Sequence, residues 1–527
     1  MITGKNIIGY ELSALGVNTA SSFDARQGIA LEGEFVEANV LEIELAMEKA
    51  QEAFLTYKNV SGKKRAEFLR AISEEILLLG DDLIHRCMAE TGLPEGRFKG
   101  ERGRTVFQLQ SFADLLDEGS WVEARIDTAM PDRKPMPRVD LRKMLIPLGP
   151  VVVFTASNFP LAYSTAGVDT ASALASGCPV IVKNHPAHFG AGEMVGQAIM
   201  KAAKKTNMPE GVFSLLNGIG FEVGESLVKH PLTKAVGFTG SFIGGKAIYD
   251  MAQNREIPIP VFAEMGSTNP VLLLPEALKN KAEQIGKDYA SSINLGVGQF
   301  CTNPGLLIGV EGDDLNRFTE SLKEGIAQAK PFTMLHKGIK ANYDKLRNER
   351  IAEFGVCLES ESTLDADHQK SEARPTVVSV SANDFLQNTN MHKEVFGPFS
   401  MLVKCKTADE LHQVVESVEG QLTSTLMAEG SDYSSFENTI NVLKEKAGRL
   451  VFNGVPTGVE VCPAMHHGGP FPATTDSRFS SVGADAIKRF ARPISLQDCP
   501  VELLPEELKD ENALGIWRLV DNQWTNG

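Results

Sequence analysis

Apolar residues recur three and four positions apart over residues 39–58 and again over residues 62–79. This spacing gathers them on one face of a helix, so both segments are predicted to form amphipathic α-helices. Residues 121–145 have a different pattern, because apolar and polar positions alternate on either side of a proline-rich connection, MPDRKPMP. Alternation with a period of two predicts a two-stranded β arm.

From residue 150 onward, short apolar runs alternate with helix-like segments. The strand-like runs are PVVVFTA, CPVIVKN, VFSLLNG, KAVGFTG and PVFAEMG. A second region with the same alternation of strand-like and helix-like segments covers residues 269–455. Short strands separated by helices predict parallel sheets that carry helices on both faces. Because such sheets bind ligands at the carboxyl ends of their strands, polar residues that directly follow these runs are candidates for a site.

Length and charge narrow the class of protein. A chain of 527 residues is longer than one hydrophobic core usually supports, so two or more domains are expected. The net charge of -16 and the pI of about 5.2 argue against a nucleic acid partner, which needs a basic surface. The start of the chain lacks a basic region followed by an apolar one, and no run reaches the length of a membrane span, so we expect a cytoplasmic protein with no membrane partner.

Seven cysteines are spread through the chain, and none forms a CxxC pair. An odd number at wide spacing is typical neither of a disulfide framework nor of a zinc site. Cys301, in GQFCTNPG, is a candidate nucleophile, although a free cysteine more often packs in a core. His466 and His467, in MHHGG, do not both turn their rings to one ion from a strand, and no Asp or Cys cluster flanks them, so no metal is expected.

Three further motifs could serve Cys301, and each is weak evidence alone. Glu264 directly follows the run PVFA, where a carboxylate could activate water or could simply cap the strand end. Asn158 follows VVVF in an Asn-Phe-Pro turn, and its amide could donate to an oxyanion. Gly240 and Gly245, in VGFTGSFIGG, lie between a strand and a helix, where backbone N–H groups can meet a pyrophosphate.

Taken together, these segments are specific. They occur in a fixed order: FTASNFP, VKNHPAH, FTGSFIGG, FAEMGSTNP, GQFCTNPG and KEVFGPF. The set resembles the aldehyde dehydrogenase superfamily along nearly the whole chain. The resemblance implies an α/β protein with a Rossmann-type cofactor domain, an α/β catalytic domain and a β-hairpin oligomerisation arm. The expected ranges are 1–120 and 148–265 for the NAD(P)-binding domain, 266–470 for the catalytic domain, and 121–147 and 471–527 for the arm and the C-terminal region.

The resemblance also implies catalytic roles. Cys301 would attack the aldehyde carbon as the nucleophile. The side-chain amide of Asn158 and the backbone N–H of Cys301 would hold the oxyanion of the thiohemiacetal, and Glu264 would activate water to hydrolyse the thioester. The reaction itself requires such groups. A thiol with a pKa of about 8.5 is only a few per cent ionised at pH 7, so it needs a base or a positive charge nearby, and hydride leaves only when the thiohemiacetal oxygen is stabilised.

The residues that the resemblance assigns to the cofactor are Lys183, His185, Gly240, Ser241, Gly245, Glu394 and Phe396. Lys183 would reach the adenosine ribose, and Glu394 and Phe396 would position the nicotinamide ribose and ring. Many NAD-preferring members carry a glutamate three residues after the lysine, but this chain has Pro186 there. A 2'-phosphate would meet no like charge, so NADP is expected, with NAD as the alternative. His185 could instead only pack in the loop.

Several segments point to a substrate class: KNHPAH, EMGSTNP, CPAMHHGGPFPATTDSRFSSVG and NALGIWRLVD. They look most like the branch that oxidises α-ketoglutaric semialdehyde (2,5-dioxopentanoate) to 2-oxoglutarate, and fatty aldehyde dehydrogenases share part of the pattern. A substrate with a carboxylate distal to its aldehyde group would be bound by a cation at the mouth of the substrate tunnel. Arg104 and Arg478 are the candidates, although either could equally make an ion pair within the protein. Phe300 and Phe471 are expected to shape the aldehyde pocket.

Two other functions remain open at this point. In a thiol acyltransferase or phosphorylating reductase, coenzyme A or phosphate would replace water, but Glu264 favours hydrolysis. A non-catalytic structural or binding protein with this fold would lack Cys301, Glu264 or Asn158, and all three are present. A small-molecule aldehyde is therefore the expected partner. The arm, which in the family joins a neighbouring subunit's sheet, implies a homodimer or homotetramer.

Overall fold

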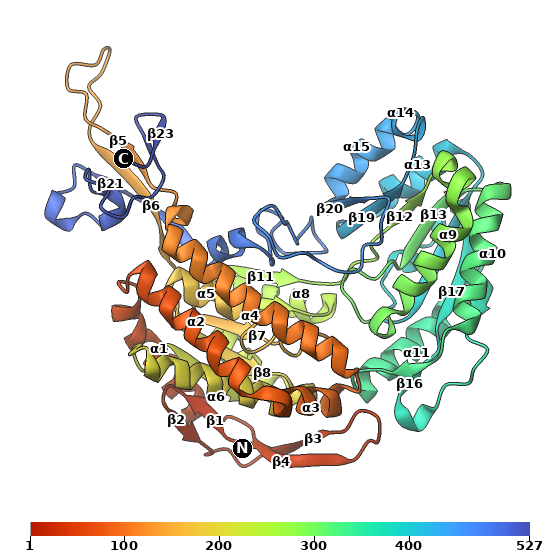
Figure 1. The fold of residues 1–527 in the computed structure, drawn as a ribbon, viewed down its shortest axis with the longest axis horizontal. Helices are drawn as coiled ribbons and strands as arrows, with labels where there is room; N and C mark the ends of the chain where they lie inside the picture. The colour runs from red at the N-terminus through yellow and green to blue at the C-terminus, as the bar shows by residue number, and fades with distance from the viewer. Residues whose placement is uncertain (1) are drawn as a thin grey trace.

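The computed structural model describes residues 2–527 and contains two seven-stranded sheets flanked by helices, with a smaller sheet projecting from one end (Figure 1). The first sheet has the order β11-β10-β7-β8-β9-β1-β2. Its strands are β1 (Asn6–Ile8), β2 (Glu11–Ser13), β7 (Val151–Phe154), β8 (Val180–Asn184), β9 (Phe213–Asn217), β10 (Ala235–Thr239) and β11 (Val261–Glu264). Strands β11 to β9 are parallel, which confirms the parallel sheet predicted after residue 150, and β1 joins β9 in the antiparallel direction.

Alternate residues of the central strands enter two separate hydrophobic cores. Val151 and Val153 of β7 belong to one core, and Val152 between them belongs to the other. The first core is shared with α2 (Gly62–Leu78), α3 (Gly80–Thr91), α4 (Glu95–Glu118), α5 (Val168–Ser176) and α6 (Phe189–Lys205), and the second with α1 (Val40–Tyr57), α7 (Glu222–Lys229) and α8 (Phe242–Gln253). Burial on both faces is the reason that these strands read as uninterrupted apolar runs.

The two helices predicted from the N-terminal pattern are confirmed as α1 and α2. At the start of α1, the side chain of Asn39 accepts a hydrogen bond from the backbone of Glu42, and the side chain of Glu42 accepts one from the backbone of Asn39, each at 3.0 Å. This capping box satisfies two backbone N–H groups that a helix start otherwise leaves without partners. Ile43, Met47 and Ala50 then line the buried face at the expected spacing.

The second sheet has the order β15-β17-β18-β13-β12-β19-β20, and only β15 runs antiparallel to its neighbour. Its strands are β12 (Val271–Leu273), β13 (Leu306–Val310), β15 (Cys357–Glu361), β17 (Thr376–Ser381), β18 (Phe399–Cys405), β19 (Gln421–Met427) and β20 (Ala447–Phe452). The helices of this region are α9 (Pro275–Asn294), α10 (Asp313–Gln328), α11 (Lys337–Ala352), α12 (Ala382–Gln387), α13 (Ala408–Ser417), α14 (Asp432–Ser435) and α15 (Glu437–Lys446). Two further strand pairs are small: β3 (Thr19–Phe23) with β4 (Ala30–Val36), and β14 (Phe332–Thr333) with β16 (Glu372–Ala373).

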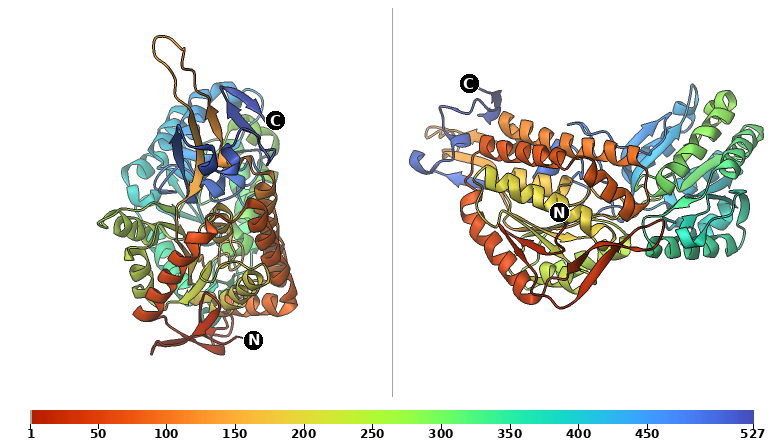
Figure 2. Two further views of the ribbon diagram at one scale, coloured as in Figure 1. Left: turned by 90° about the vertical axis from the view of Figure 1, so that its left-hand side faces the viewer. Right: turned by 60° about the horizontal axis from the view of Figure 1, so that its bottom comes forward.

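The predicted arm is confirmed as a β hairpin that extends beyond the body of the molecule (Figure 2). Its strands are β5 (Arg125–Asp127) and β6 (Leu141–Pro147), and an isolated bridge joins Met130 to Arg138 beyond them. Strands from the C-terminal region complete a five-stranded sheet in the order β21-β6-β5-β22-β23: β21 (Ala491–Gln497), β22 (Arg518–Val520) and β23 (Gln523–Thr525). The sequence pattern indicated the hairpin but not the three strands that flank it.

The chain between β20 and the 3-10 helix η6 (Ala484–Phe490) passes over the carboxyl end of β11 (Figure 1). Glu264 forms a β bridge with Thr474, and Met265 N–H donates to the carbonyl of Ala473 at 2.8 Å. This crossing brings residues far apart in sequence to the end of the first sheet. The division into domains by residue range stays a prediction. Within residues 2–527, the structure has no helix that is both long and apolar enough to span a bilayer.

Candidate active site

Cys301 lies in a tight loop between α9 and β13. The loop passes through Gly296, Val297 and Gly298, all at positive φ (56°, 61° and 63°). A Cβ at Gly298 would overlap the carbonyl oxygen of Gly397, so only glycine fits this close approach. A β-branched residue at positive φ, as at Val297, is strained, and such strain is found mainly where the surrounding structure holds a functional loop.

Asn269 holds the loop from the other side. Its Nδ2 donates to the carbonyl oxygens of Cys301 at 2.8 Å and Asn303 at 2.9 Å. Asn303 in turn donates to the Gly397 carbonyl at 3.2 Å. Within residues 2–527, the backbone N–H of Cys301 makes no hydrogen bond. The carbonyls of the loop are therefore fixed while one N–H beside the sulfur stays available. Sequence reasoning singled out the motif EMGSTNP but missed Asn269 in it.

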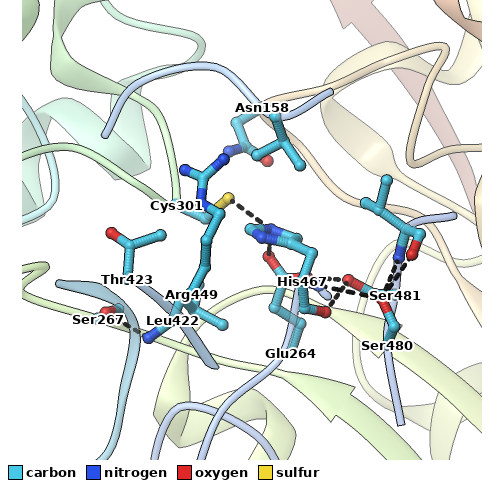
Figure 3. A network of polar contacts seen from close by, with 12 residues as sticks. Asn158, Glu264, Ser267, Cys301, Leu422, Thr423, Arg449, His467, Ser480 and Ser481 are labelled. Atoms are coloured by element: carbon cyan, nitrogen blue, oxygen red, sulfur yellow. Dashed lines mark hydrogen bonds and ion pairs between the residues drawn. The ribbon is translucent and has the colours of Figure 1, made fainter. Parts of the chain in front are cut away.

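The structure brings Cys301 and Glu264 together through a third side chain, His467 (Figure 3). Nε2 of His467 lies 3.5 Å from Cys301 Sγ and 3.1 Å from Glu264 Oε1. His467 is fully buried and Glu264 is 3% exposed. Ser480 and Ser481 position the histidine: Ser480 Oγ accepts from the His467 N–H at 3.0 Å, and the Ser481 N–H donates to the His467 carbonyl at 2.8 Å. The cluster is therefore held from two loops and a strand end.

The hydrogen bonds decide the charges in this cluster. Burial raises the pKa of Glu264, but the charge and hydrogen bond of His467, together with a hydrogen bond from the Ser481 hydroxyl, outweigh burial and lower it, so the carboxyl group is an anion at neutral pH. An anion beside Nε2 requires that Nε2–H donate to it. Burial raises the pKa of Cys301 well above its ordinary value, and the negative charge of Glu264 raises it further. The resting sulfur is therefore a thiol.

His467 has neighbours that the sequence around the histidine pair did not indicate. A cysteine and a glutamate do lie against it, although they are distant in sequence, and the donor atoms of the three residues all lie within 4.8 Å of one another. Tetrahedral Zn²⁺ with Zn–S of about 2.3 Å and Zn–N of about 2.0–2.1 Å separates sulfur from nitrogen by about 3.5 Å. Cys301 and His467 have that separation, so this donor set could hold a thiophilic cation. His466 is not part of it.

Asn158 lies beside the nucleophile loop, as expected. Its Nδ2 donates to the Gln299 carbonyl at 3.3 Å, which leaves one of its two amide hydrogens for another acceptor. Arg97 fixes the local structure, because its guanidinium stacks on the rings of Phe159 and Phe300 at 4.3 and 4.6 Å and donates to the Asn158 carbonyl at 3.2 Å. The amide is thus rigidly presented near Cys301.

The residues expected at the pyrophosphate lie where β10 turns into α8. Ser241 is the N-cap of α8, and its hydroxyl accepts from Gly244 N–H at 3.2 Å. A Cβ at Gly245 would come within 2.6 Å of Met265, so glycine allows α8 to approach the end of β11. Gly240 directly precedes the cap. The N-terminus of a twelve-residue helix offers N–H groups and a positive dipole end, so this turn fits an anionic group.

Lys183 lies near the carboxyl end of β8. Its ammonium group donates to the Gly218 carbonyl at 2.8 Å and, within residues 2–527, has no carboxylate at ion-pair distance. Burial lowers the pKa of Lys183 to about 8, although Glu37 partly opposes this. A half-buried cation without a carboxylate at ion-pair distance fits a polyhydroxyl or anionic cofactor group. His185 caps the 3-10 helix η2 (Pro186–His188) by accepting from Ala187 N–H at 3.1 Å, and burial lowers its pKa well below the ordinary value, so it packs as a neutral side chain.

Glu394 and Phe396 lie on the far side of the nucleophile loop. Both line a cavity with Gly298 and Ser267. A Cβ at Gly266 would lie 2.6 Å from Glu394 Oε2, so Glu394 sits against the chain just after Glu264. Burial raises the pKa of Glu394 to about 8. The expected nicotinamide residues and the expected base therefore share one end of β11.

The four expected substrate residues separate into two groups. Phe300 packs against Phe159 at 5.6 Å, and Arg104 donates to the Val459 carbonyl at 2.5 Å and lies in the electrostatic field of Cys301. Phe471 instead contacts Phe242 at the start of α8, and Arg478 has an 80% exposed side chain that pairs with Asp476. The structure therefore does not bring Phe471 and Arg478 together with Phe300 and Arg104. Arg478 makes the ion pair that was the alternative for it.

Comparison with known families agrees with this geometry: the profile of the aldehyde dehydrogenase family matches residues 30–470. The chain belongs to the aldehyde dehydrogenase family, whose members are oxidoreductases that use NAD(P). It is 49% identical to α-ketoglutaric semialdehyde dehydrogenase 2 of Azospirillum brasilense, over 99% of both chains. It is 44% identical to the α-ketoglutaric semialdehyde dehydrogenase of Acinetobacter baylyi, again over 99% of both.

Solved structures of lower identity share the fold. The structure of 3,6-anhydro-L-galactose dehydrogenase in complex with NAP matches with a TM-score of 0.79 at 21% identity, covering 94% of this chain and 99% of that one. Apo betaine aldehyde dehydrogenase of Staphylococcus aureus matches with a TM-score of 0.80 at 18% identity, covering 96% and 98%. These likenesses confirm the predicted fold class.

Proposed function

We propose that this protein oxidises α-ketoglutaric semialdehyde to 2-oxoglutarate with NAD(P), through a thiohemiacetal and a thioester on Cys301. The names of the two relatives at 49% and 44% identity support the substrate. The observation that carries the chemistry is the contact of Cys301, His467 and Glu264, because it combines a nucleophile, a proton donor and a carboxylate in one buried cluster. Arg104, a cation near the sulfur, suits a substrate with a second carboxylate.

The roles of the residues follow from their protonation. The thiol proton of Cys301 passes to the anionic Glu264, and the Nε2–H of His467, at 3.5 Å from the sulfur, then stabilises the thiolate. The free backbone N–H of Cys301 and the spare amide hydrogen of Asn158 receive the oxyanion after attack on the aldehyde. When bound, NAD(P) supplies the hydride acceptor. After proton release, Glu264 activates the water that hydrolyses the thioester.

The cofactor pocket favours NADP on electrostatic grounds. Lys183 offers a half-buried cation without a carboxylate partner, and Pro186 occupies the position where an acid would repel a 2'-phosphate. The turn at Gly240 and Ser241 would hold the pyrophosphate, and Glu394 with Phe396 would hold the nicotinamide end. NAD is the alternative, and the ratio of kcat/KM values for the two cofactors decides between them.

The test is a panel of aldehydes with and without a terminal carboxylate, each assayed with NAD and NADP. The highest kcat/KM is expected for α-ketoglutaric semialdehyde. If long-chain aliphatic aldehydes have the highest value, the protein is a fatty aldehyde dehydrogenase and the semialdehyde proposal fails. Cys301→Ala is expected to abolish oxidation while leaving cofactor binding, and Glu264→Gln to release one equivalent of reduced cofactor and then stall. Unchanged steady-state turnover in Glu264→Gln would exclude the hydrolytic base and reopen acyl transfer to coenzyme A or phosphate.

A homodimer or homotetramer is part of the same proposal. The strands β5 and β6 lie within the five-stranded sheet, but the tip of the hairpin, residues 129–137, is exposed and extends beyond the body of the molecule (Figure 2). Such an arm is stable when it packs on a second copy. Light scattering of the full-length protein measures the mass directly, and a monomer would contradict the proposal.

A further inference from the structure

Arg449, on β20, extends its side chain toward Cys301 and Asn158 (Figure 3). Its Nη1 donates to the Gly458 carbonyl at 3.1 Å and its Nη2 to the Pro456 carbonyl at 2.8 Å. Its Nε is buried and has no hydrogen-bond partner within residues 2–527. An unpaired buried donor is costly, so a partner for it is expected in the working enzyme.

Arg104 reaches the same loop from α4. It donates to the Val459 carbonyl, one residue after the Arg449 contact at Gly458, and its guanidinium lies 5.9 Å from the ring of Tyr163. Its Nε is also buried without a partner. Two guanidinium groups, one from each of the two large bodies of the fold, therefore converge on the loop 456–459.

Neither arginine has a counter-ion. Within residues 2–527, no carboxylate lies at ion-pair distance from Arg104 or Arg449. Arg489 shows the contrasting case of a structural arginine, because it is 3% exposed and pairs with Asp169 at 2.8 Å. Both unpaired arginines interact electrostatically with Cys301. Glu264 and Glu394 act on the sulfur in the opposite direction to Arg104, because they raise the pKa of Cys301 and Arg104 lowers it.

We propose that Arg449 and Arg104 together form a carboxylate-binding subsite beside Cys301, and that Arg449 is a specificity-determining residue. The ligand class is an anion joined by a short chain to the reacting carbon. A carboxylate seated there would accept from the unpaired guanidinium N–H groups, and guanidinium matches carboxylate geometry in a bidentate manner. An aldehyde with an apolar tail would cover both half-buried guanidinium groups without supplying a counter-ion or an acceptor for their unpaired Nε–H groups, so the subsite selects against it. The inference rests on the proposed semialdehyde oxidation and names its recognition site.

The first experiment compares aldehydes of equal chain length in Arg449→Met. For α-ketoglutaric semialdehyde and glutarate semialdehyde, kcat/KM is expected to fall about 10- to 100-fold, the loss expected for a charge-assisted hydrogen bond. For pentanal it should stay unchanged or rise. Arg478→Met, at an exposed ion pair, is the matched control and should change neither. Equal losses for pentanal and the semialdehydes, or no loss for any, would overturn the proposal.

The second experiment needs no aldehyde. Iodoacetate and iodoacetamide alkylate the same thiol, but only iodoacetate carries a carboxylate. For each protein, the inactivation rate with iodoacetate is divided by the rate with iodoacetamide. Dividing this value for Arg449→Met by the value for the wild type removes the intrinsic difference between the two reagents. This ratio is expected to fall at least tenfold and to recover partly in Arg449→Lys, which keeps the charge but loses the planar fork. If Arg449→Met does not fold, the lysine variant tests the same ratio, and an unchanged ratio overturns the subsite.

The two experiments distinguish a failure of the proposed function from a failure of the proposed subsite. If the wild type does not oxidise the semialdehyde but the alkylation ratio falls in Arg449→Met, the proposed function is wrong and the anion subsite stands. If the wild type oxidises the semialdehyde and the ratio is unchanged, the function stands and the subsite is overturned.

Discussion

Replacing His467 by Phe tests the central cluster most directly. Phenylalanine keeps a planar ring in a fully buried position but removes Nε2, which contacts both Cys301 Sγ at 3.5 Å and Glu264 Oε1 at 3.1 Å. The thiolate loses a charge-assisted hydrogen bond worth about 1.5–3 kcal/mol. One pKa unit is about 1.4 kcal/mol, so the pKa of Cys301 should rise by about one to two units. The thiolate fraction at pH 7 then falls about 10- to 100-fold.

The assay is the rate of inactivation by iodoacetamide as a function of pH. A raised pKa moves the midpoint of this profile to higher pH, so the variant should react more slowly than the wild type at pH 7 and approach it at high pH. His467→Gln, which restores an N–H donor, should recover part of the rate. His466→Phe, at the adjacent position outside the cluster, is the control. A midpoint that does not move in His467→Phe would refute the assignment of Nε2–H as the thiolate donor.

Three further outcomes are expected. The pKa of Lys183 is about 8, so its charge is present below pH 8 and lost above it; the ratio of kcat/KM for NADP to that for NAD should fall as pH rises from 7 to 9, and Lys183→Met should abolish this change. The pKa of Glu394 is raised to about 8 from an unfolded value near 4.5, so between these pH values the folded state holds a proton that the unfolded state has lost. The free energy of unfolding that this group contributes should therefore fall by up to about 1.4 kcal/mol per pH unit as the pH rises from 4.5 to 8. Urea unfolding of Glu394→Gln should lack this pH dependence. Micromolar Zn²⁺ should inhibit reversibly through Glu264, Cys301 and His467, and inhibition that persists unchanged in His467→Phe or resists EDTA would contradict the site.

Local patterns predicted much of the fold. The 3.6-residue periodicity of α1 and α2, the alternation in the arm and the apolar runs of β7, β8, β10 and β11 all report whether one or both faces of an element are buried. That information is local to the chain. Cys301, Glu264 and Asn158 were found because each follows a strand or turn in a recognisable motif, and the structure places Cys301 close to both others through His467 and Gln299.

His467 and Arg449 could not be found in this way. His467 is 166 residues from Cys301 in sequence and 203 from Glu264, and its own neighbours, another histidine and two glycines, carry no sign of them. Arg449 lies in an ordinary strand of the second sheet. The path of residues 453–483 over the end of β11 brings His467 to the nucleophile, and Arg449 reaches it from β20 of the second sheet, so both contacts depend on how the two sheets pack. The sequence by itself determined which residues could react and which elements would be buried. The tertiary structure alone decided which charges meet at the sulfur, because electrostatic interactions depend on distance in space and not on separation along the chain.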